Sequence, residues 1–374
     1  MKFVISSALL SARLQSVGRV IAAKNTLPIL NCFLFDIKGN QLTITASDNE
    51  TTLRTTLELA ESDSDIRFAA NAKTIQDAMK EIPEQPLDFY VNDKTLEVTV
   101  EYRYGKYNFM AQAADEYPVP GQIEADAPSF EVKAPLLLDG INRTILATAD
   151  DALRPVMNGI FFDIKQTDLT LVASDGHRLC CDKVLETPAA AEGSFILPKK
   201  PATLLRSVLA KETENVTIAY NGRNAVMRSA GFELTCRLIE GRYPNYNSVI
   251  PKDNPNQATI NREALIAALR RVLIFSNAVS SLIKVRLEDG KMTISSQDTD
   301  YAMSAEESLI CDYSGTPMSI GFKGPFMLDL ITNLQSEEIV LRLADASRAG
   351  IIVPALQNEG EEVLMLLMPM MLGE

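Results

Sequence analysis

Apolar residues recur at helical spacing in several stretches of the chain. Residues 6–24 carry them at every third or fourth position: Leu9, Leu10, Leu14, Val17 and Ile21. Residues 261–277 show the same spacing: Leu265, Ile266, Leu269, Val272 and Leu273. This spacing places the apolar side chains on one face of a helix. On this basis we predict helices over 6–24, 72–82, 134–150, 198–211, 261–277 and 323–335.

Other stretches alternate between apolar and polar residues, which is typical of a strand with one buried face. In residues 42–47, LTITAS, apolar side chains alternate with hydroxyl side chains. Asn92-Asp93 and Asn221-Gly222 stand between such stretches, where they predict hairpin turns.

One block of two predicted strands occurs three times. It reads FLFDIKGNQLTITASD at 33–48, FFDIKQTDLTLVASDGHRL at 161–179 and VRLEDGKMTISSQD at 285–298. Asp48, Asp175 and Asp298 end the three strand pairs, so the copies lie 127 and 123 residues apart. Each block follows a strand and a helix, and precedes a strand, a second helix and paired strands. We therefore predict three copies of one α+β fold, each with two helices and about eight strands.

Polar, proline-rich stretches separate the three copies. They are YPVPGQIEADAP at 117–128 and PKDNPN at 251–256. Such stretches are typical of domain boundaries. We predict domains over 1–124, 125–252 and 253–374.

The composition is that of an ordinary globular chain, with 46% hydrophobic and 23% charged residues. No run of about eighteen apolar residues occurs, so we predict no transmembrane helix. Arg13 and Arg19 interrupt any apolar core of a signal peptide. We therefore expect the protein in the cytoplasm.

Cysteine and histidine usage argues against a disulfide framework and a metal site. The five cysteines are odd in number and include no C-x-x-C pair, and His177 is the only histidine. We read the cysteines as buried free thiols and expect no metal and no cofactor.

The corner that holds His177 has to be tested for catalysis, because Ser174 and Asp175 stand beside it. A catalytic triad needs side chains that converge, whereas residues one and three apart on a turn point apart. No P-loop, G-x-G-x-x-G or G-x-S-x-G motif occurs either. We therefore expect no catalytic residue. A hydrolase that uses Ser174 and His177 is the alternative from the enzyme class.

The net charge of −13 argues, taken alone, against a protein that binds nucleic acid by neutralising phosphates. The charge is distributed unevenly along the chain, however, and this weakens the argument against nucleic-acid binding. The six predicted helical stretches together carry +8, so the rest of the chain carries −21. Glu forms helices as well as Lys does, yet it is nearly absent from these stretches. We infer a helix-lined face for a polyanion and an acidic exterior.

Three tandem copies, SDGHRL after the second strand pair, RYPNY at 242–246 and MPM at 368–370 together resemble the bacterial DNA polymerase III β subunit family, the sliding clamps. LPIL at 27–30 and Asn158-Gly159 fit as well, so the resemblance covers the chain from its start to Met370. It implies three tandem DNA-clamp domains, each with two helices packed on antiparallel sheets. It also implies a non-catalytic processivity factor of DNA replication.

In that family two protomers pair head-to-tail into a homodimeric ring around duplex DNA. Twelve helices, each about 10 Å across, give a circumference of roughly 120 Å and an opening of about 28 Å, which admits a duplex. An acidic protein can then hold DNA topologically, with weak contacts that do not depend on DNA sequence. We assign these contacts to Lys24, Arg154, Lys199, Lys200, Arg206 and Arg270.

The resemblance also implies a pocket between the second and third domains. In the family it receives short linear motifs from the replicative polymerase, the clamp loader and repair proteins. Flexible Met and Leu side chains suit such a promiscuous site. The pocket residues are Met157, Gly176, His177, Arg178, Leu179, Pro244, Val249, Leu366, Leu367, Met368, Pro369 and Met370.

For the contact that closes the ring, we expect Tyr107 and Phe109 of one copy to meet Ile274 and Phe275 of the other. We also expect Lys73 to face an acidic residue, either Asp298 or Asp300. The competing hypothesis is an acidic three-domain adaptor that binds peptides and never encloses DNA.

Overall fold

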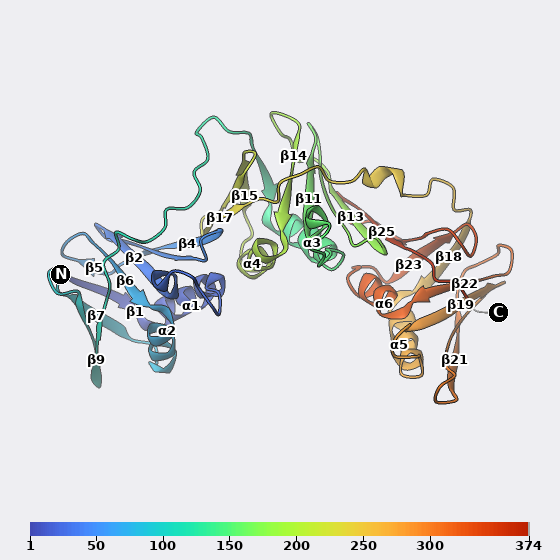
Figure 1. Ribbon diagram of the computed structural model, residues 1–374, viewed down its shortest axis with the longest axis horizontal. Helices are drawn as coiled ribbons and strands as arrows, with labels where there is room; N and C mark the ends of the chain where they lie inside the picture. The colour runs from blue at the N-terminus through green and yellow to red at the C-terminus, as the bar shows by residue number, and fades with distance from the viewer. Residues whose placement is uncertain (373–374) are drawn as a thin grey trace. The chain divides into compact units, whose positions relative to one another are not determined.

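The three predicted repeats are present as three successive runs of the same elements in the computed structural model, which describes residues 1–372 (Figure 1). The first run is β1 (Lys2–Ser6), α1 (Ser7–Val17), β2 (Cys32–Lys38), β3 (Gln41–Ser47), β4 (Thr51–Glu58), β5 (Glu61–Ser62), β6 (Ile66–Asn71), α2 (Ala72–Glu81), β7 (Pro86–Val91), β8 (Glu97–Tyr102) and β9 (Gly105–Met110).

The second and third runs repeat this order without a counterpart of the short β5. The second is β10 (Ser129–Lys133), α3 (Ala134–Ile145), β11 (Gly159–Ile164), β12 (Leu169–Ser174), β13 (Arg178–Val184), β14 (Gly193–Pro198), α4 (Lys199–Leu209), β15 (Asn215–Tyr220), β16 (Asn224–Arg228) and β17 (Glu233–Arg237). The third is β18 (Asn256–Asn261), α5 (Arg262–Leu273), β19 (Leu282–Glu288), β20 (Lys291–Asp298), β21 (Met303–Ile310), β22 (Met318–Lys323), α6 (Gly324–Thr332), β23 (Glu338–Leu343), β24 (Gly350–Pro354) and β25 (Glu361–Leu367). The predicted α+β class is confirmed.

The helices begin where the sequence supplies a capping side chain, and they end earlier than the apolar spacing predicts. Ser6 and Asn261 accept the N–H groups of Leu9 and Ala264 at the starts of α1 and α5. The first predicted helix, 6–24, stops being α-helical at Val17, where a short 3₁₀ turn follows. Ile21 has extended backbone, so its apolar side chain belongs to the loop.

The chain divides into two units of close contact, and the division runs through the second repeat. One unit contains residues 1–135 and 203–238, and the other contains residues 136–202 and everything described from 239 onward. The strands of the second repeat explain this division, because β10 and β15–β17 pair in one sheet and β11–β14 pair in another.

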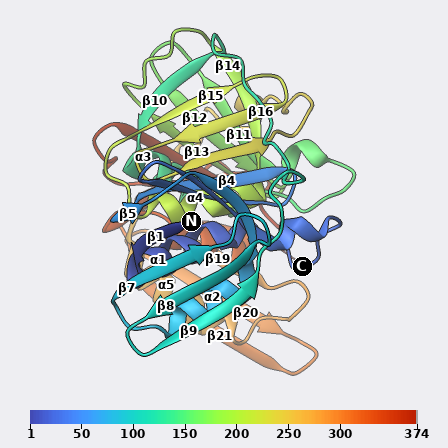
Figure 2. The same ribbon diagram turned by 90° about the vertical axis from the view of Figure 1, so that its left-hand side faces the viewer.

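The first unit holds two antiparallel sheets. A five-stranded sheet has the order β5-β1-β7-β8-β9, with β9 at its edge (Figure 2). An eight-stranded sheet has the order β10-β15-β16-β17-β4-β3-β2-β6. In it β17 pairs with β4, so strands of the first and second repeats form one continuous sheet. Stacked aromatic pairs, Phe3 with Phe89 and Phe35 with Phe68, fill the core.

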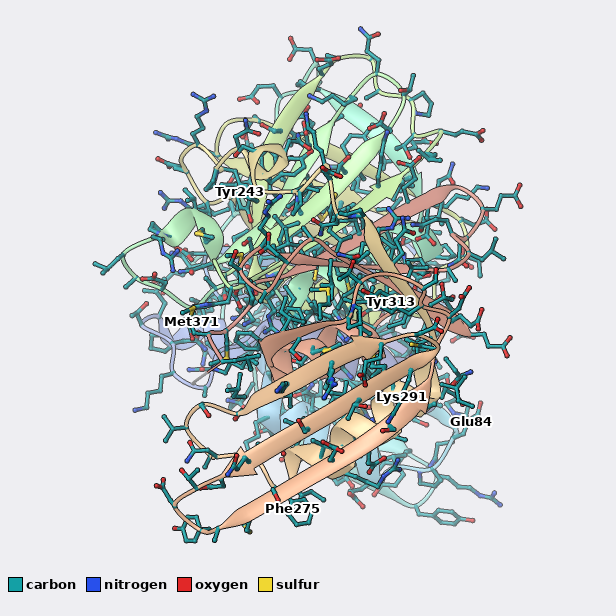
Figure 3. All side chains as sticks on the ribbon, turned by 90° about the vertical axis from the view of Figure 1, so that its right-hand side faces the viewer. Glu84, Tyr243, Phe275, Lys291, Tyr313 and Met371 are labelled. Atoms are coloured by element: carbon teal, nitrogen blue, oxygen red, sulfur yellow. The ribbon has the colours of Figure 1, made fainter. Side chains whose placement is uncertain are left out.

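The second unit repeats this arrangement. Its eight-stranded sheet has the order β14-β11-β12-β13-β25-β24-β23-β18, in which β13 pairs with β25. Its four-stranded sheet has the order β21-β20-β19-β22. Figure 3 shows the four-stranded sheet, with Phe275 close to its outermost strand. Within residues 1–372, no helix is long and apolar enough to cross a membrane.

Candidate partner and DNA interfaces

The SDGHRL motif forms a tight turn between β12 and β13. Gly176 has a φ of +89°, a left-handed conformation that glycine adopts without a steric penalty. One Asp175 carboxylate oxygen accepts the backbone N–H groups of His177 and Arg178, both at 2.9 Å. The Ser174 hydroxyl donates to the carbonyl of Arg178 at 2.9 Å. The serine and the aspartate therefore hold the turn and are not arranged as a nucleophile with its base.

Arg178 fixes this turn against α6 of the third repeat. Its Nε lies 3.1 Å from Asp175 Oδ2, and its Nη1 lies 2.8 Å from Asp329 Oδ2. The guanidinium carbon stands 4.2 Å from the ring centre of Phe326, and the His177 ring lies 6.2 Å from the same ring. Such ion pairs and cation–π contacts keep a flat side chain in one orientation. The predicted pocket residues His177 and Arg178 therefore lie against α6.

Strand pairing brings the SDGHRL turn beside residues 366–368. Leu179 stands opposite Leu366, and Arg178 stands opposite Leu367, in the β13–β25 pair. The N–H of Met368 donates to the His177 carbonyl at 2.8 Å. The structure therefore brings together two groups of the predicted pocket residues, 176–179 and 366–368, although they lie almost 190 residues apart in sequence.

An apolar cluster lies beneath these residues, on the face of the sheet covered by the 239–250 loop. Its buried members are Val172, Leu179, Ile196, Tyr243, Ala349 and Leu366. The Tyr243 ring stacks on Phe161 with centres 4.8 Å apart. The RYPNY motif thus anchors the loop that carries Pro244 and Val249.

A second tyrosine of the same motif is held by a polar contact. The Tyr246 hydroxyl donates to Asp163 Oδ2 at 2.8 Å. Burial raises the pKa of Tyr246, and the hydrogen bond to Asp163 raises it further, so the phenol stays protonated and remains a donor.

The predicted pocket residues divide into a buried base and an exposed rim. Met157, Leu179, Leu366 and Leu367 are buried. Val249 is 56% exposed and Met368 is 43% exposed, so apolar surface is open to a partner. Gly176, His177 and Pro244 are also exposed, whereas Arg178, Pro369 and Met370 are half-buried.

A buried ion cluster in the second unit was not predicted from the sequence. Arg143 of α3 lies 2.7 Å from Asp182 of β13 and 2.6 Å from Glu361 at the start of β25, and Asp139 is 3.7 Å away. Burial raises the pKa of Asp182 to about 6, although Arg143 opposes this shift. The cluster connects the helix of one repeat to the sheet strand of the next.

The six basic residues assigned to DNA are all exposed. In the first unit, Lys24 lies in the loop after the first 3₁₀ turn, and Arg206 lies on α4 between buried Leu205 and Leu209. In the second unit, Lys199 and Lys200 begin α4, and Arg270 lies near the end of α5.

Arg154 has a carboxylate partner within its own loop. Its Nε bonds Asp151 Oδ2 at 2.8 Å, and the side chain is 51% exposed. A phosphate would have to compete with Asp151 for this guanidinium.

The apolar residues expected at the closing contact lie on one sheet edge and after one helix end. Tyr107 and Phe109 belong to β9, the last strand of the five-stranded sheet. Ile274 and Phe275 follow α5 and are 71% and 38% exposed.

The polar residues expected at this contact have different accessibilities. Lys73 is exposed on α2. Asp298 is only 3% exposed and accepts the N–H of Asp300 at 3.1 Å. Asp300 is exposed, so it is the more accessible of the two acidic residues.

Family comparisons match the three repeats one by one. Models of the N-terminal, central and C-terminal domains of the DNA polymerase III β subunit match residues 1–120, 131–245 and 247–371. Among curated relatives, the beta sliding clamp of Haemophilus influenzae is 28% identical over 367 residues, and that of Pseudomonas putida is 26% identical over 371 residues. Each alignment covers 98% of this chain and 99% of the relative.

Solved structures give the same result. A crystal structure of the Pseudomonas aeruginosa DNA polymerase sliding clamp aligns with a TM-score of 0.92 at 25% identity. The DNA polymerase III β subunit of Thermotoga maritima aligns with a TM-score of 0.89 at 26% identity. Both alignments cover the whole of both chains. A sliding clamp of P. aeruginosa bound to griselimycin aligns with a TM-score of 0.93 at 25% identity. The chain therefore belongs to the DNA polymerase III β subunit family, the sliding clamps that act as processivity factors in DNA replication.

Proposed function

We propose that two copies of this chain close head-to-tail into a ring that encircles duplex DNA. The observation that carries this proposal is the pairing of sheet edges between repeats. In the first unit β17 pairs with β4, and in the second unit β25 pairs with the corresponding β13. The equivalent edges that remain are β9 of the first repeat and β21 of the third, and neither has a neighbour on its outer side in the described chain. An open edge is a template for a further strand.

The internal repeat also supplies a register for the β9–β21 pair. Thr51, Arg178 and Met303 are equivalent, because each stands across the hairpin from the aspartate that ends its block. Thr51 faces Cys236 and Arg178 faces Leu367 across the two repeat junctions.

Phe109 is the β9 equivalent of Cys236. It pairs with Val98 at the start of β8, as Cys236 pairs with Ala225 near the start of β16. In the proposed register Phe109 therefore faces Met303, and Lys106 faces Glu306.

The residues after the first helix of each repeat support the same arrangement. Leu146 and Ala147, which follow α3, join the apolar core of the third repeat. Ile274 and Phe275 occupy the equivalent positions after α5 and are exposed. By the same geometry they would pack against the first repeat of the second copy. Lys73 would face Asp300 there, with buried Asp298 contributing less.

For DNA we propose sequence-independent contacts from Lys24, Arg154, Lys199, Lys200, Arg206 and Arg270. Exposed cations can neutralise phosphates without reading bases, which allows sliding. Retention by a closed ring explains how a chain of net charge −13 stays on DNA. The bonds that occupy Ser174 and Asp175 within their turn support a role without catalysis.

For partners we propose that short linear motifs of the polymerase, the clamp loader and repair proteins bind the exposed rim at Val249 and Met368. The sliding clamp of P. aeruginosa that was solved with bound griselimycin is consistent with a ligand pocket of this kind. Deleting 368–374 should abolish motif binding and leave the dimer intact, as measured by fluorescence polarisation and light scattering. A monomeric product would show that the tail serves assembly. The last two residues of this deletion lie outside the described chain.

The decisive experiment for the ring uses circular and linear DNA. Protein loaded by a clamp loader onto a nicked circle should stay bound, and it should leave after the circle is cut. Equal loss from both DNAs would support the peptide adaptor that never encloses DNA. The double substitution Ile274→Ala and Phe275→Ala should give monomers by light scattering.

We further propose the domain boundaries 1–124, 125–252 and 253–374, and a location in the cytoplasm. Limited proteolysis would test the boundaries, because the polar stretches at 117–128 and 251–256 should be cut before the repeats themselves.

A further inference from the structure

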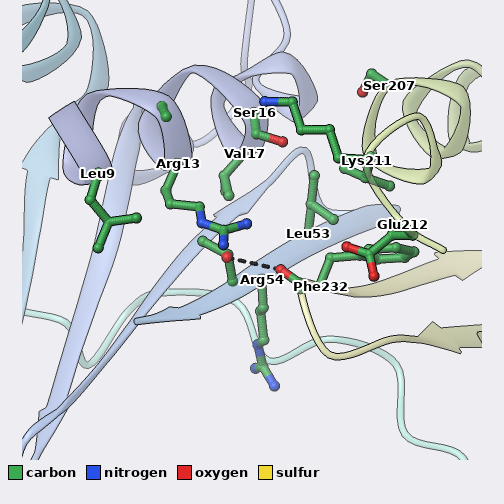
Figure 4. A pocket seen from close by; sticks show the side chains of 14 residues that line it. Leu9, Arg13, Ser16, Val17, Leu53, Arg54, Ser207, Lys211, Glu212 and Phe232 are labelled. Carbon is green, nitrogen blue, oxygen red and sulfur yellow. Dashed lines mark hydrogen bonds between the residues drawn. The ribbon is translucent and has the colours of Figure 1, made fainter. Parts of the chain in front are cut away.

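A pocket of about 270 Å³ lies within the first unit, at the junction of the first and second repeats (Figure 4). Residues of α1, β4, the end of α4 and the β16–β17 turn line it. Its apolar lining includes Val17, Leu53 and Phe232, which are almost completely buried. This combination of a concave shape and an apolar lining is what small-molecule sites share.

Charged side chains from two repeats face this apolar lining. Arg13 comes from α1, and Lys211 and Glu212 follow α4. Within residues 1–372 neither Arg13 nor Lys211 makes an ion pair. A Cβ placed on Gly231 would lie 2.3 Å from Glu212 Oε1 and 3.8 Å from Arg13 Nη1, so both groups reach the same wall of the pocket. Arg54 also lines the pocket, but its guanidinium pairs with Glu233 at 3.4 Å. The other charged lining residues, Arg13, Lys211 and Glu212, carry a net charge of +1.

The junction of the second and third repeats differs from the junction of the first and second repeats at one helix position. Arg143 is the tenth residue of α3, and the tenth residue of α1 is Ser16, which lines the pocket. At the second junction the long side chain of Arg143 fills the space and bonds two carboxylates. At the first junction the short Ser16 leaves the space open, and the strand position of Asp182 is held by Thr55.

We propose that this pocket binds a small organic monoanion, with a flat apolar body against the lining and one carboxylate between Arg13 and Lys211. Glu212 would repel a second negative group, so the charge of the pocket selects a single carboxylate. The proposal is independent of the ring, because every lining residue belongs to one unit of one chain.

Naphthalene-2-carboxylate is a suitable probe, and its fluorescence is not obscured because the chain contains no tryptophan. We expect its anisotropy to rise on binding, with a dissociation constant below about 1 mM, which is ordinary for a ligand of this size. Arg13→Gln and Lys211→Gln should each weaken binding at least tenfold. Arg19→Gln and Lys80→Gln remove exposed cations of the same unit outside the pocket, and they should leave it unchanged. Neutral naphthalene-2-carboxamide should bind at least tenfold more weakly.

Equal affinity of the Arg13→Gln variant, the Lys211→Gln variant and the unaltered chain would overturn the proposal. Displacement of the probe by a short DNA duplex would also overturn it, because the cations would then serve DNA. If either charge variant fails to show cooperative thermal unfolding, Ser16→Leu decides the matter. It fills the pocket without removing a charge, so undiminished probe binding would count against the site.

Discussion

Exchanging the charges of Lys106 and Glu306 tests the proposed register of the closing strands. Lys106 lies on β9 and Glu306 on β21, and both side chains are exposed in the single chain. The equivalent pair at the first junction is Glu233 and Arg54, whose charged atoms are 3.4 Å apart with side chains about one third exposed. We therefore expect an ion pair between copies as well, with the cation on β9 and the carboxylate on β21, the reverse of the arrangement on β17 and β4.

The size of the effect follows from this exposure. A partly exposed ion pair contributes about 0.5–1 kcal/mol, and two like charges directly opposite cost a similar amount. The substitution Lys106→Glu should therefore weaken the binding free energy by about 1–2 kcal/mol at each interface. A two-copy ring has two identical interfaces, so its dissociation constant should rise about 30- to 1,000-fold. Glu306→Lys should have the same effect, and the double variant should return close to the original value.

Sedimentation velocity over a concentration series measures these constants. The effect of each single substitution should shrink at high salt, because salt screens exposed charges. Lys94→Glu and Glu359→Lys alter exposed charges outside both strands and should not change dimerisation. If the double variant is weaker than either single variant, the two residues do not face each other and the proposed register is wrong.

Three further predictions concern the second unit. Arg143→Met should lower the free energy of unfolding by about 3–5 kcal/mol in urea, because it leaves buried carboxylates without a partner; an unchanged urea midpoint would contradict this. Burial raises the pKa of Asp182 to about 6, above its ordinary value near 3.9, so its protonation stabilises the folded chain below about pH 4. This contribution, about 3 kcal/mol, is lost as the pH rises through 6, and Asp182→Asn should flatten that part of the stability profile. Phe326→Ala removes the ring beneath Arg178, so motif binding should weaken about tenfold while the dimer persists. Fluorescence polarisation measures this affinity, and an unchanged value would show that α6 does not contribute to motif binding.

The repeat and its elements could be predicted from the sequence because they depend on local periodicity. The alternation in residues 42–47 and its copies predicted the strands, and Asn92-Asp93 predicted the turn between β7 and β8 correctly. The predicted helix over 6–24 extends too far. Spacing does not register the point at which a 3₁₀ turn replaces the helix.

The ion cluster and the α6 contact could not be predicted in the same way. Arg143 meets Glu361 across 218 residues, and Arg178 meets Asp329 across 151. No local pattern selects such partners, because each pair joins elements of two different repeats that meet only in the folded chain. The sequence identified Arg178 through its motif, but nothing in the motif indicates Phe326 or Asp329.

The charges on the two free edges also bear on why the proposed assembly is a head-to-tail pair. An exposed strand edge can pair with any other edge, including its own copy. β9 carries Lys106 and no acidic residue, whereas β21 carries Glu306 and Glu307 and no basic residue. Pairing β9 with β9 or β21 with β21 would oppose like charges, and pairing β9 with β21 opposes unlike charges. Specificity is the difference in binding free energy between such alternative pairings. The Lys106→Glu chain and the Glu306→Lys chain should therefore each dimerise much more weakly alone than the unaltered chain. Mixing them should form a ring in which one interface has the exchanged charges and the other has the original pair, so both oppose unlike charges. This result distinguishes edge selection from a general loss of stability.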